Sequence, residues 1–440
     1  MASTYLTRTN GTSTEQKIFT FSAWVKRSAI STSGDKVLMA EYTDSNNRMK
    51  LQFKDDDFFE VYQVDGGNIR TQVKTNRKFR DSNGWYHMLI VGDNTQGTNT
   101  NRLKIYVNGV QETSFSVSTY PYSSTIPNIN ENSKTITIGN DDIGGSYFDG
   151  SMSHVHFIDG TAYTPSAFGE TDATTGEWKA KTSPSVTYGT NGFLILKDGN
   201  TITDQSSNSN NFTLGGGTLT DLKDNPENVF ATMNPLDKNN VVVLANGNTT
   251  SHSSDNTTWA AANRATLGIA KDKFYWEMKI TGSGTANGLF FGVCADTVTL
   301  ITSQGIQDNA TEKAKGVLVF CDDGRYQLDT NSRVNMTSAP AFNDILGCAV
   351  DRDNNTVKFY KNGSEVGSIN ISSSPLATCS HIMPFMINFY TNTKFNFNFG
   401  NGYFGTTAVS SAGTNASGIG IFEYNVPAGY TALSTKGLNT

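Results

Sequence analysis

The sequence predicts an all-β protein made of two tandem antiparallel β-sandwiches. Apolar and polar residues alternate along short segments, Asn-Gly pairs follow two of these segments, and the arrangement occurs twice. Leu103–Gly109 reads LKIYVNG, and Val357–Gly363 reads VKFYKNG. Alternation with period two is typical of a half-buried strand, and Asn-Gly favours a type I′ hairpin because both residues tolerate positive φ. Two similar β-meanders so far apart indicate two modules.

Composition limits the classes of function. A chain of 440 residues can form two or three domains with separate cores. The net charge of -6 offers no basic surface to displace counterions from phosphate, so we expect no nucleic-acid partner. No apolar run reaches the roughly 18 residues that span a membrane, and the start MASTYLTRTNGTS lacks a basic region followed by an apolar one. We therefore expect neither membrane insertion nor secretion through a signal peptide.

The four cysteines lie in or beside apolar segments and lack the CxxC spacing of zinc sites. Free buried thiols are the expected state of such cysteines in a reducing compartment. The sequence thus predicts no structural zinc.

The first module is expected to occupy residues 1–165, because its strand-like segments are short and separated by polar turns. In Phe19–Lys26, for example, Phe19, Phe21, Ala23 and Val25 share one face. The expected strands are 3–8, 19–26, 37–42, 49–53, 58–64, 85–91, 103–107, 136–139 and 153–158. This spacing is that of an antiparallel sandwich.

Four segments of this module carry a family resemblance: FSAWVKRS (Phe21–Ser28), WYH (Trp85–His87), LKIYVNG and FDGSMSHVHFIDG (Phe148–Gly160). Together they resemble the concanavalin-like lectin family that includes laminin-G domains. More narrowly, they resemble versions of this module in structural proteins of tailed bacteriophages, especially marine ones. The resemblance implies a two-sheet jelly roll whose rim loops often bind glycans, sometimes with calcium.

Residues 166–226 are expected to form an appendage and linker that packs on the first sandwich. Within them, Asp204–Asn211 reads DQSSNSNN. The phage proteins resembled here carry Asp-x-Ser-Gly-Asn-Gly-Asn at this place. This chain departs from that pattern, because Ser207 and Ser209 stand where the two glycines would be.

A second module is expected at residues 227–405, followed by a C-terminal tail at 406–440. FYWEMKI (Phe274–Ile280), LGCAVDRDNNTVKFYKNG (Leu346–Gly363) and FNFNFG (Phe395–Gly400) resemble a SPRY domain. The resemblance implies a β-sandwich that recognises proteins and has no typical catalytic residues. The tail contains VPAGYTALSTKGL, which is similar to the closing motif of phage proteins of this kind.

Two clusters of titratable residues have alternative interpretations. The acidic cluster Asp55–Asp57 and Glu60 could supply a glucanase acid pair, but a solvated turn is favoured because charge runs usually mark exposed loops. His154 and His156 lie two apart on an expected strand and so would share one face, as two metal ligands do. No third ligand lies nearby in sequence, so we expect both imidazoles to face outward without a metal.

Oxygen-bearing residues in two expected rim loops are the candidate binding site for a glycan or receptor. They are Asp93, Asn140, Asp141, Asp142 and Tyr147. Asp93, Asp141 and Asp142 are also weak candidates for a Ca²⁺ site, because carboxylates suit this ion. The alternative is that these aspartates only form turns through their own backbone hydrogen bonds. No other cofactor is expected, and no catalytic residue is assigned.

Two recognition-type folds in tandem, with no credible acid pair, favour a non-enzymatic phage virion surface protein. The leading hypothesis is a tail fibre or receptor-binding adhesin that contacts host surface glycans or envelope proteins. The alternatives are a capsid decoration or fibre-like structural protein and, third, a glycan depolymerase. The expected partners are other virion proteins, the host surface and further copies of the chain. The expected location is the virion, after synthesis in the host cytoplasm.

Overall fold

The computed structural model of the chain describes residues 3–30, 33–141, 145–197, 199, 201–257, 261–283, 288–300, 309–313 and 315–439. The chain divides into two compact units. The first comprises Met1–Asp221 and Asn225–Glu227, and the second comprises Leu222–Asp224 and Asn228–Thr440. Each unit contains two large sheets whose strands pair almost wholly antiparallel, which confirms the predicted fold class.

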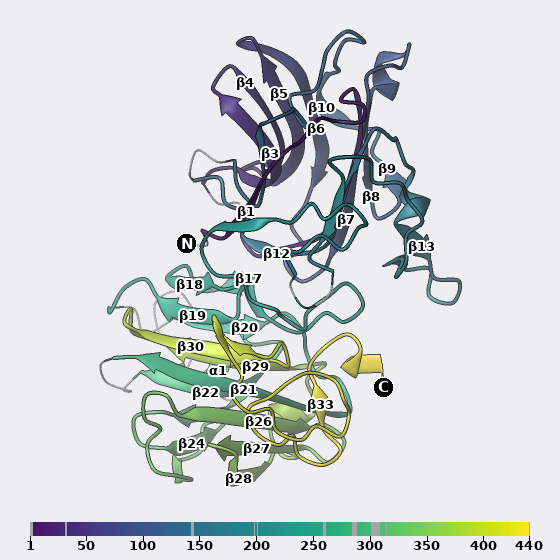
Figure 1. Ribbon diagram of the computed structural model, residues 1–440. Coiled ribbons are helices and arrows are strands. Elements are labelled where there is room, and N and C mark those ends of the chain that lie inside the picture. Colours follow the sequence, from purple (N-terminus) through teal and green to yellow (C-terminus); the bar gives the residue numbers. More distant parts are fainter. Residues whose placement is uncertain are drawn as a thin grey trace. The chain divides into compact units, whose positions relative to one another are not determined.

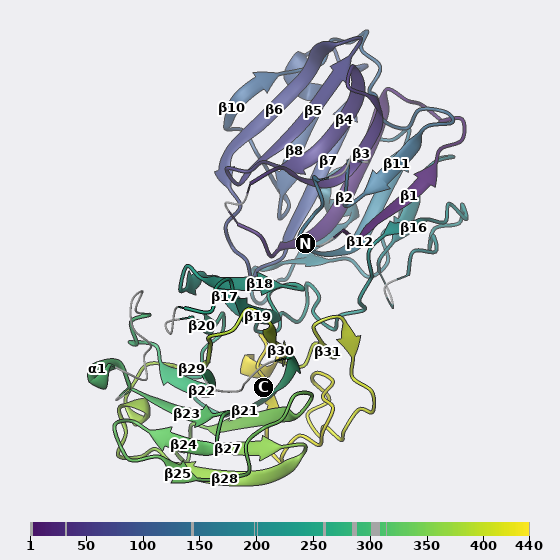
Figure 2. The same ribbon diagram turned by 90° about the vertical axis from the view of Figure 1, so that its left-hand side faces the viewer.

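The first unit packs an eight-stranded sheet against a six-stranded one (Figures 1 and 2). The larger sheet has the order β10 (Phe115–Thr119), β6 (Asn68–Lys78), β5 (Phe58–Asp65), β4 (Asn47–Phe53), β3 (Lys36–Asp44), β11 (Thr135–Ile138), β1 (Tyr5–Thr9) and β16 (Thr213–Gly216). The smaller sheet has the order β15 (Phe193–Ile195), β12 (Gly150–Asp159), β2 (Ile18–Arg27), β7 (Tyr86–Asp93), β8 (Leu103–Val107) and β9 (Val110–Gln111). The remaining elements are the hairpin of β13 (Gly169–Thr171) and β14 (Trp178–Ala180) and the 3-10 turns Asn99–Asn101 and Pro165–Ala167.

Alternation along the strands fills the core between these two sheets. Phe19, Phe21, Ala23 and Val25 on β2 belong to the same buried cluster as Met49, Leu51 and Phe53 on β4. The Asn-Gly turn between β8 and β9 has the predicted geometry, since φ is 49° at Asn108 and 80° at Gly109. Local sequence signals therefore determine this part of the fold.

Residues beyond the predicted first module complete both of its sheets. β15 pairs with β12, where Phe193 lies opposite Phe157. β16 pairs with β1, so the chain near residue 214 returns to its first strand. The segment after residue 165 is thus an integral part of the first unit.

The second unit is also a two-sheet sandwich. One sheet has the order β17 (Met233–Lys238), β20 (Ala262–Ala265), β29 (Ile382–Asn388), β22 (Leu289–Ala295), β23 (Gly316–Phe320), β24 (Arg325–Leu328) and β25 (Val334–Asn335). The other has the order β18 (Val242–Ala245), β19 (Thr250–Ser253), β30 (Thr393–Asn398), β21 (Lys273–Gly282), β26 (Ile345–Asp351), β27 (Thr356–Lys361) and β28 (Ser364–Asn370). The small elements are β31 (Tyr403–Phe404), β32 (Thr407–Ala408), β33 (Thr431–Ala432), α1 (Ala310–Lys313) and the 3-10 turns Pro375–Ala377 and Gly437–Asn439.

The C-terminal segment forms part of the core of this second unit. β33 pairs in parallel with the first residues of β21, beside the stretch of β21 that pairs with β30. Phe422 and Leu433 lie in the same buried cluster as Trp276. The buried carboxylate of Glu277 accepts hydrogen bonds of 2.9 Å from the backbone N–H groups of Glu423 and Tyr424. The tail is therefore bound both by apolar packing and by a buried acceptor.

The expectation that His154 and His156 share one outward face is wrong. A bulge in β12 between Ser153 and His156 interrupts the alternation, and His154 has a φ of 49°, so the two histidines do not share one outward face. His156 is buried, and its Nδ1 lies 2.9 Å from the hydroxyl of Tyr188. The physical reason is that an extra residue in a strand shifts the following side chains to the other face.

Three of the four cysteines are buried as expected. Among the described residues the cysteines form no disulfide; Cys294, Cys321 and Cys348 are buried and Cys379 is half-buried. Burial raises the pKa of each thiol. In the described part of the chain, no helix has the length and apolar character needed to cross a membrane.

Candidate functional site

The predicted site residues do not come together in one place. Asp93 ends β7 opposite Ile18, the first residue of β2. Gly150, three residues after Tyr147, lies opposite Arg27, the last residue of β2. Ten residues of extended strand span roughly 30 Å, so Asp93 and Gly150 lie at opposite ends of the first unit.

Asp93 forms a turn with its carboxylate. One oxygen accepts hydrogen bonds from the backbone N–H (3.1 Å) and hydroxyl (2.5 Å) of Thr95, and the other accepts one from the side-chain amide of Gln96 (2.6 Å). This is the turn-forming alternative raised from the sequence.

The other predicted residues are largely engaged with their neighbours. Asn140 and Asp141 are buried, and Oδ2 of Asp141 lies 2.5 Å from the ammonium of Lys50. Tyr147 is half-buried, with its ring centroid 5.9 Å from that of Tyr5. Asp142 lies outside the described residues. In the part of the chain that the structure describes, no three His, Cys, Asp or Glu residues group as metal ligands would, and calcium at these positions stays a prediction.

A pocket of about 740 Å³ opens at the Asp93 end of the first unit, and we call it the Tyr122 pocket. Its lining is rich in amides, hydroxyls and charged groups: Gln16, Thr43, Asn47, Asp65, Arg70, Tyr122, Ser124, Thr125, Ile126, Asn128, Glu131, Asn132 and Lys134. The volume lies within the range of small-ligand sites. Tyr122 is 66% exposed and Ile126 is 51% exposed, so the pocket presents apolar surface to solvent among polar groups.

The loop that bears Tyr122 is held by hydrogen bonds from the segment between β7 and β8. The guanidinium of Arg102 donates to the carbonyl oxygens of Gln96 (2.7 Å), Gly97 (2.8 Å) and Pro121 (3.0 Å). The side-chain amide of the buried Asn94 donates to the carbonyl of Thr125 (2.8 Å). The turn that Asp93 forms therefore supports one wall of the pocket, although Asp93 does not line it.

The same loop is bound from the larger sheet. The buried Gln63 on β5 donates to the carbonyl of Ile126 and to the side-chain oxygen of Asn128, both at 2.9 Å. Asn128 in turn donates to the carbonyl of Val64 (3.2 Å), and Gln16 donates to that of Pro127 (3.1 Å). Such contacts fix the backbone before any ligand arrives, which lowers the entropy cost of binding.

The charged groups of the Tyr122 pocket balance one another. Asp65 and Arg70 form a loose, half-exposed pair with an N···O distance of 3.6 Å. Burial raises the pKa of Glu131, the negative charge of Asp65 adds to this, and the ammonium of Lys134 opposes it. Two acids and two bases leave the lining near neutrality, so it favours no strongly charged ligand.

The buried Glu41 holds the backbone of Glu131, which lines the Tyr122 pocket. Glu41 on β3 accepts a hydrogen bond from the side-chain amide of Asn10 (2.8 Å), and both of its oxygens accept from the backbone N–H of Glu131 (3.2 and 3.3 Å). Burial raises the pKa of Glu41 to about 8, with the neighbouring charge of Glu131 adding to the shift. Glu41 is therefore largely uncharged at neutral pH.

A second pocket, of about 650 Å³, lies in the same unit, and we call it the Arg8 pocket. It is lined by Thr7, Arg8, Thr9, Gly11, Thr135, Thr190, Asn191, Ser209, Asn210, Asn211 and Thr213. Part of this lining is the Asp204–Asn211 tract, in which the carboxylate of Asp204 accepts from the backbone N–H of Ser206 and of Asn210. Ser209 has a φ of 60°, a left-handed backbone geometry that glycine adopts more readily than serine.

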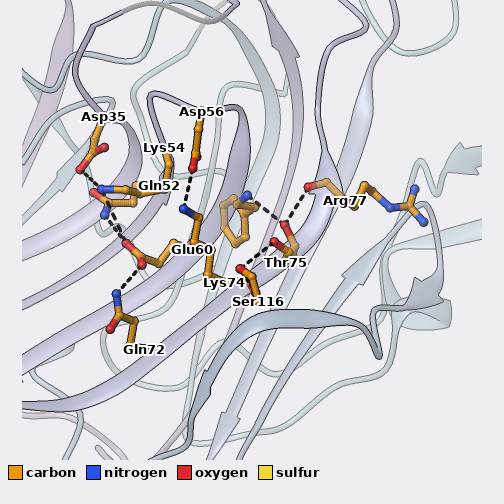
Figure 3. A network of polar contacts seen from close by, with 11 residues as sticks. Asp35, Gln52, Lys54, Asp56, Glu60, Gln72, Lys74, Thr75, Arg77 and Ser116 are labelled. Carbon is orange, nitrogen blue, oxygen red and sulfur yellow. Dashed lines mark hydrogen bonds and ion pairs between the residues drawn. The ribbon is translucent and has the colours of Figure 1, made fainter.

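The outer face of the eight-stranded sheet carries a network of polar side chains (Figure 3). Glu60 is buried and accepts from the amides of Gln52 (2.8 Å) and Gln72 (2.9 Å). Asp56 pairs with Lys74 at 2.7 Å. The carboxylates of Glu60 and Asp56 therefore bind side chains of neighbouring strands and stabilise the sheet.

The expectation that the acidic cluster is only a solvated turn is wrong for two of its members. Asp57 has no exposed surface and lies 3.1 Å from Arg27 and 2.8 Å from Arg80, while Glu60 is buried in the network above. Asp55 is exposed, as expected. Sequence spacing missed this because the partners lie elsewhere in the chain: Arg27 ends β2, Arg80 follows β6, and the amides that bind Glu60 come from β4 and β6.

The Tyr122 pocket was also missed from the sequence. The segment Tyr120–Asn128 reads YPYSSTIPN, and its two prolines with aromatic and hydroxyl side chains mark a restrained loop. That signal indicates a loop but not its neighbours. The pocket itself combines residues from Gln16 to Lys134, which only the fold brings together.

Comparisons with known proteins match both units. Residues 1–167 match the family model described as the concanavalin A-like lectin/glucanases superfamily, and residues 273–402 match that of the SPRY domain. No curated protein matches the chain.

Among solved structures, stonustoxin is 16% identical over 38% of this chain, with a TM-score of 0.30; the match spans only 27% of the stonustoxin chain. The SPRY domain of human HERC1 is 15% identical over 38% of this chain and 96% of its own, with a TM-score of 0.30. The TRIM65 PSpry domain is 12% identical over 38% and 91%, with a TM-score of 0.29.

Proposed function

We propose that this chain, in which a concanavalin A-like module precedes a SPRY domain, is an adhesin that binds glycans in the Tyr122 pocket without cleaving them. The observation that carries the proposal is the exposed ring of Tyr122 within a polar, pre-organised pocket. An aromatic ring offers an apolar face to the C–H groups of a sugar, while the surrounding amides and hydroxyls can bind its hydroxyl groups.

Binding without cleavage is supported by the state of the two acids in the pocket. Hydrolysis of a glycosidic bond uses a protonated acid and an ionised base or nucleophile on opposite sides of the bond. Asp65 is half-exposed beside Arg70, and Glu131 has the ammonium of Lys134 nearby. Both acids are only partly buried, whereas such chemistry favours an enclosed, water-poor setting.

The finer part of the proposal is that the protein belongs to a phage virion, as a tail fibre or receptor-binding protein. It is supported by the resemblance of Phe21–Ser28 and Phe148–Gly160 to modules of tailed-phage structural proteins. In this setting the partners are other virion proteins, further copies of the chain, and glycans or envelope proteins of the host. A single shallow site binds weakly, and many copies on one particle supply avidity.

The test uses the full-length protein, as a monomer and as a streptavidin-linked tetramer, on a glycan array and on isolated bacterial envelope polysaccharide. We expect the tetramer to bind and Tyr122→Ala to weaken binding about tenfold, the scale of one aromatic contact. Val110→Ala is the matched control, because Val110 is also exposed (64%) and lines neither pocket. Absence of binding by the tetramer, or release of oligosaccharides into solution, contradicts the proposal.

Placement in a virion has a separate test. Antibodies against the purified protein should label particles in lysates of infected cells, at the tail for a receptor-binding protein. Labelling over the capsid would instead support the decoration alternative.

A further inference from the structure

The two pockets of the first unit share a wall. Lys134 lines the Tyr122 pocket, and its neighbour Thr135 lines the Arg8 pocket. The strand residue Thr9, also in the Arg8 pocket, lies opposite Thr135 in the register of β1 and β11. Consecutive Cα atoms are about 3.8 Å apart, so the linings of the pockets meet along the segment 131–135.

This wall is fixed in place. The backbone N–H of Asn10 donates to the carbonyl of Lys134 (2.8 Å), and the N–H of Ser133 donates to the carbonyl of Asn10 (3.0 Å). Asn10 is only 4% exposed and donates its side-chain amide to the buried Glu41. Although the backbone of this segment is bound, Asn132 and Ser133 are exposed to solvent. A ligand can therefore cross the wall from one pocket to the other without first reorganising it.

The Arg8 pocket also suits a hydroxyl-rich, uncharged ligand. Arg8 is the one charged residue in its lining. The guanidinium donates to neutral oxygens only: the side chains of Asn10 (3.2 Å), Asn191 (3.3 Å) and Asn210 (2.7 Å) and the carbonyl of Asn191 (3.2 Å). Four of its five N–H groups are thus used. The side-chain amides of Asn191 and Asn210 already donate within the protein, so the groups left for a ligand are mainly hydroxyls such as those of Thr9 and Thr135.

Building on the proposed function, we infer that the ligand is an unbranched neutral oligosaccharide that occupies both pockets and crosses the wall formed by residues 131–135. The Tyr122 pocket binds one part of the chain by stacking and hydrogen bonding. The Arg8 pocket binds a further part mainly through hydroxyl groups. The affinity then depends on the length of the glycan, whereas binding in a single pocket would not depend on it.

The experiment measures the dependence of affinity on length. Size-fractionated neutral gluco-, galacto- and manno-oligosaccharides of two, four, six and eight units are titrated calorimetrically into the full-length protein. Thr9→Trp fills the Arg8 pocket, Tyr122→Ala changes the other pocket, and Thr407→Trp, an exposed strand threonine of the second unit, is the matched control. Thr135→Trp is the second blocking variant, and melting curves establish that each variant folds.

For the wild type we expect the longest oligosaccharides to bind at least about tenfold more tightly than the shortest. Thr9→Trp should remove this gain and leave the short ligands unaffected, whereas Tyr122→Ala should weaken both. Equal binding of long and short ligands, or long-chain affinity unchanged by both blocking variants, overturns the inference and leaves the proposed function standing. If none of these oligosaccharides binds, the inference is overturned as well, and binding of the tetramer on the glycan array decides the proposed function separately.

Discussion

The indole N–H of Trp178 donates a hydrogen bond of 2.9 Å to Nδ1 of His87. The imidazole lies between two indoles, with ring centroids 5.1 Å from Trp24 and 5.9 Å from Trp178. Because the indole can only donate, Nδ1 is the acceptor and the proton of the neutral ring lies on Nε2, which is 2.9 Å from the hydroxyl of Ser22. Trp178 thereby joins the β13–β14 hairpin to the six-stranded sheet of the first unit.

Trp178→Phe should destabilise the first unit by about 1–3 kcal/mol, because it leaves Nδ1 of His87 buried without a donor. Replacing both residues by Phe should recover part of this loss, since the orphaned polar atom is then removed. The measurement is a double-mutant cycle from denaturant unfolding, followed by near-UV circular dichroism. A coupling free energy near zero would show that the hydrogen bond contributes nothing to stability.

The buried Glu41 should make the first unit less stable as pH rises. Its pKa is about 8 in the folded state against 4.5 ordinarily, so between these values the folded state binds more protons than the unfolded state. The stabilisation is fully present below pH 4.5 and is lost as pH rises through 8. The Glu41→Gln variant should show a smaller decline in melting temperature between pH 5 and pH 8. A wild-type profile that the substitution leaves unchanged would contradict this assignment.

The buried His87 should make the first unit less stable as pH falls. Burial lowers its pKa from 6.5 to about 3, so the unfolded state takes up a proton first. Stability should fall as pH drops from about 6.5 towards 3, by at most about 1.4 kcal/mol per pH unit. The His87→Phe variant should lose part of this acid sensitivity, because burial also lowers the pKa of His156 and that group contributes in the same direction. Thermal unfolding followed between pH 6.5 and 4 measures the difference. Acid sensitivity equal to that of the wild type would assign the effect to other groups.

Asp57→Asn should destabilise the first unit by roughly 3–5 kcal/mol, the usual cost of leaving a buried charge without its partner. Asp57 is fully buried and Arg27 is 2% exposed, so water cannot replace the lost carboxylate. Asp55→Asn is the control: Asp55 is exposed two residues away and should change stability by no more than about 0.5 kcal/mol. Equal effects of the two substitutions in denaturant unfolding would mean that the ion pair does not stabilise the fold.

The two Asn-Gly turns should be intolerant of a β-branched residue. Gly109 and Gly363 have φ values of 80° and 81°, and a Cβ atom would lie 2.7 Å from the ring of Trp178 and 2.5 Å from that of Tyr424, respectively. Gly109→Val and Gly363→Val should each destabilise their own unit by at least roughly 1–3 kcal/mol. The melting temperature of each variant measures the effect. Gly418→Val is the control, because φ is positive there but no atom lies near the added Cβ, so it separates backbone strain from steric overlap. Unchanged melting of both hairpin variants would contradict the turn geometry.

The sequence was informative where the determining contacts are local. Alternation along Phe19–Lys26 and the two Asn-Gly pairs predict strands and turns, because the period of two and positive φ are properties of a few consecutive residues. The partners of Asp57, the bulge at His154 and the walls of the Tyr122 pocket depend on strands that are distant in sequence. The separation of the predicted rim residues Asp93 and Asp141 within the first unit also depends on how distant strands pair, so the sequence did not reveal it.

The position of β33 has a consequence for synthesis. β21 cannot gain its parallel partner, nor Glu277 its two backbone donors, until the chain near Ala432 has left the ribosome. At roughly 5–20 residues per second, the apolar side chains of Phe274 and Trp276 wait roughly 8–30 seconds for this segment. The first unit needs nothing from it and can fold beforehand. Translation that stops before residue 419 would therefore yield a finished first module attached to an incomplete, aggregation-prone second one.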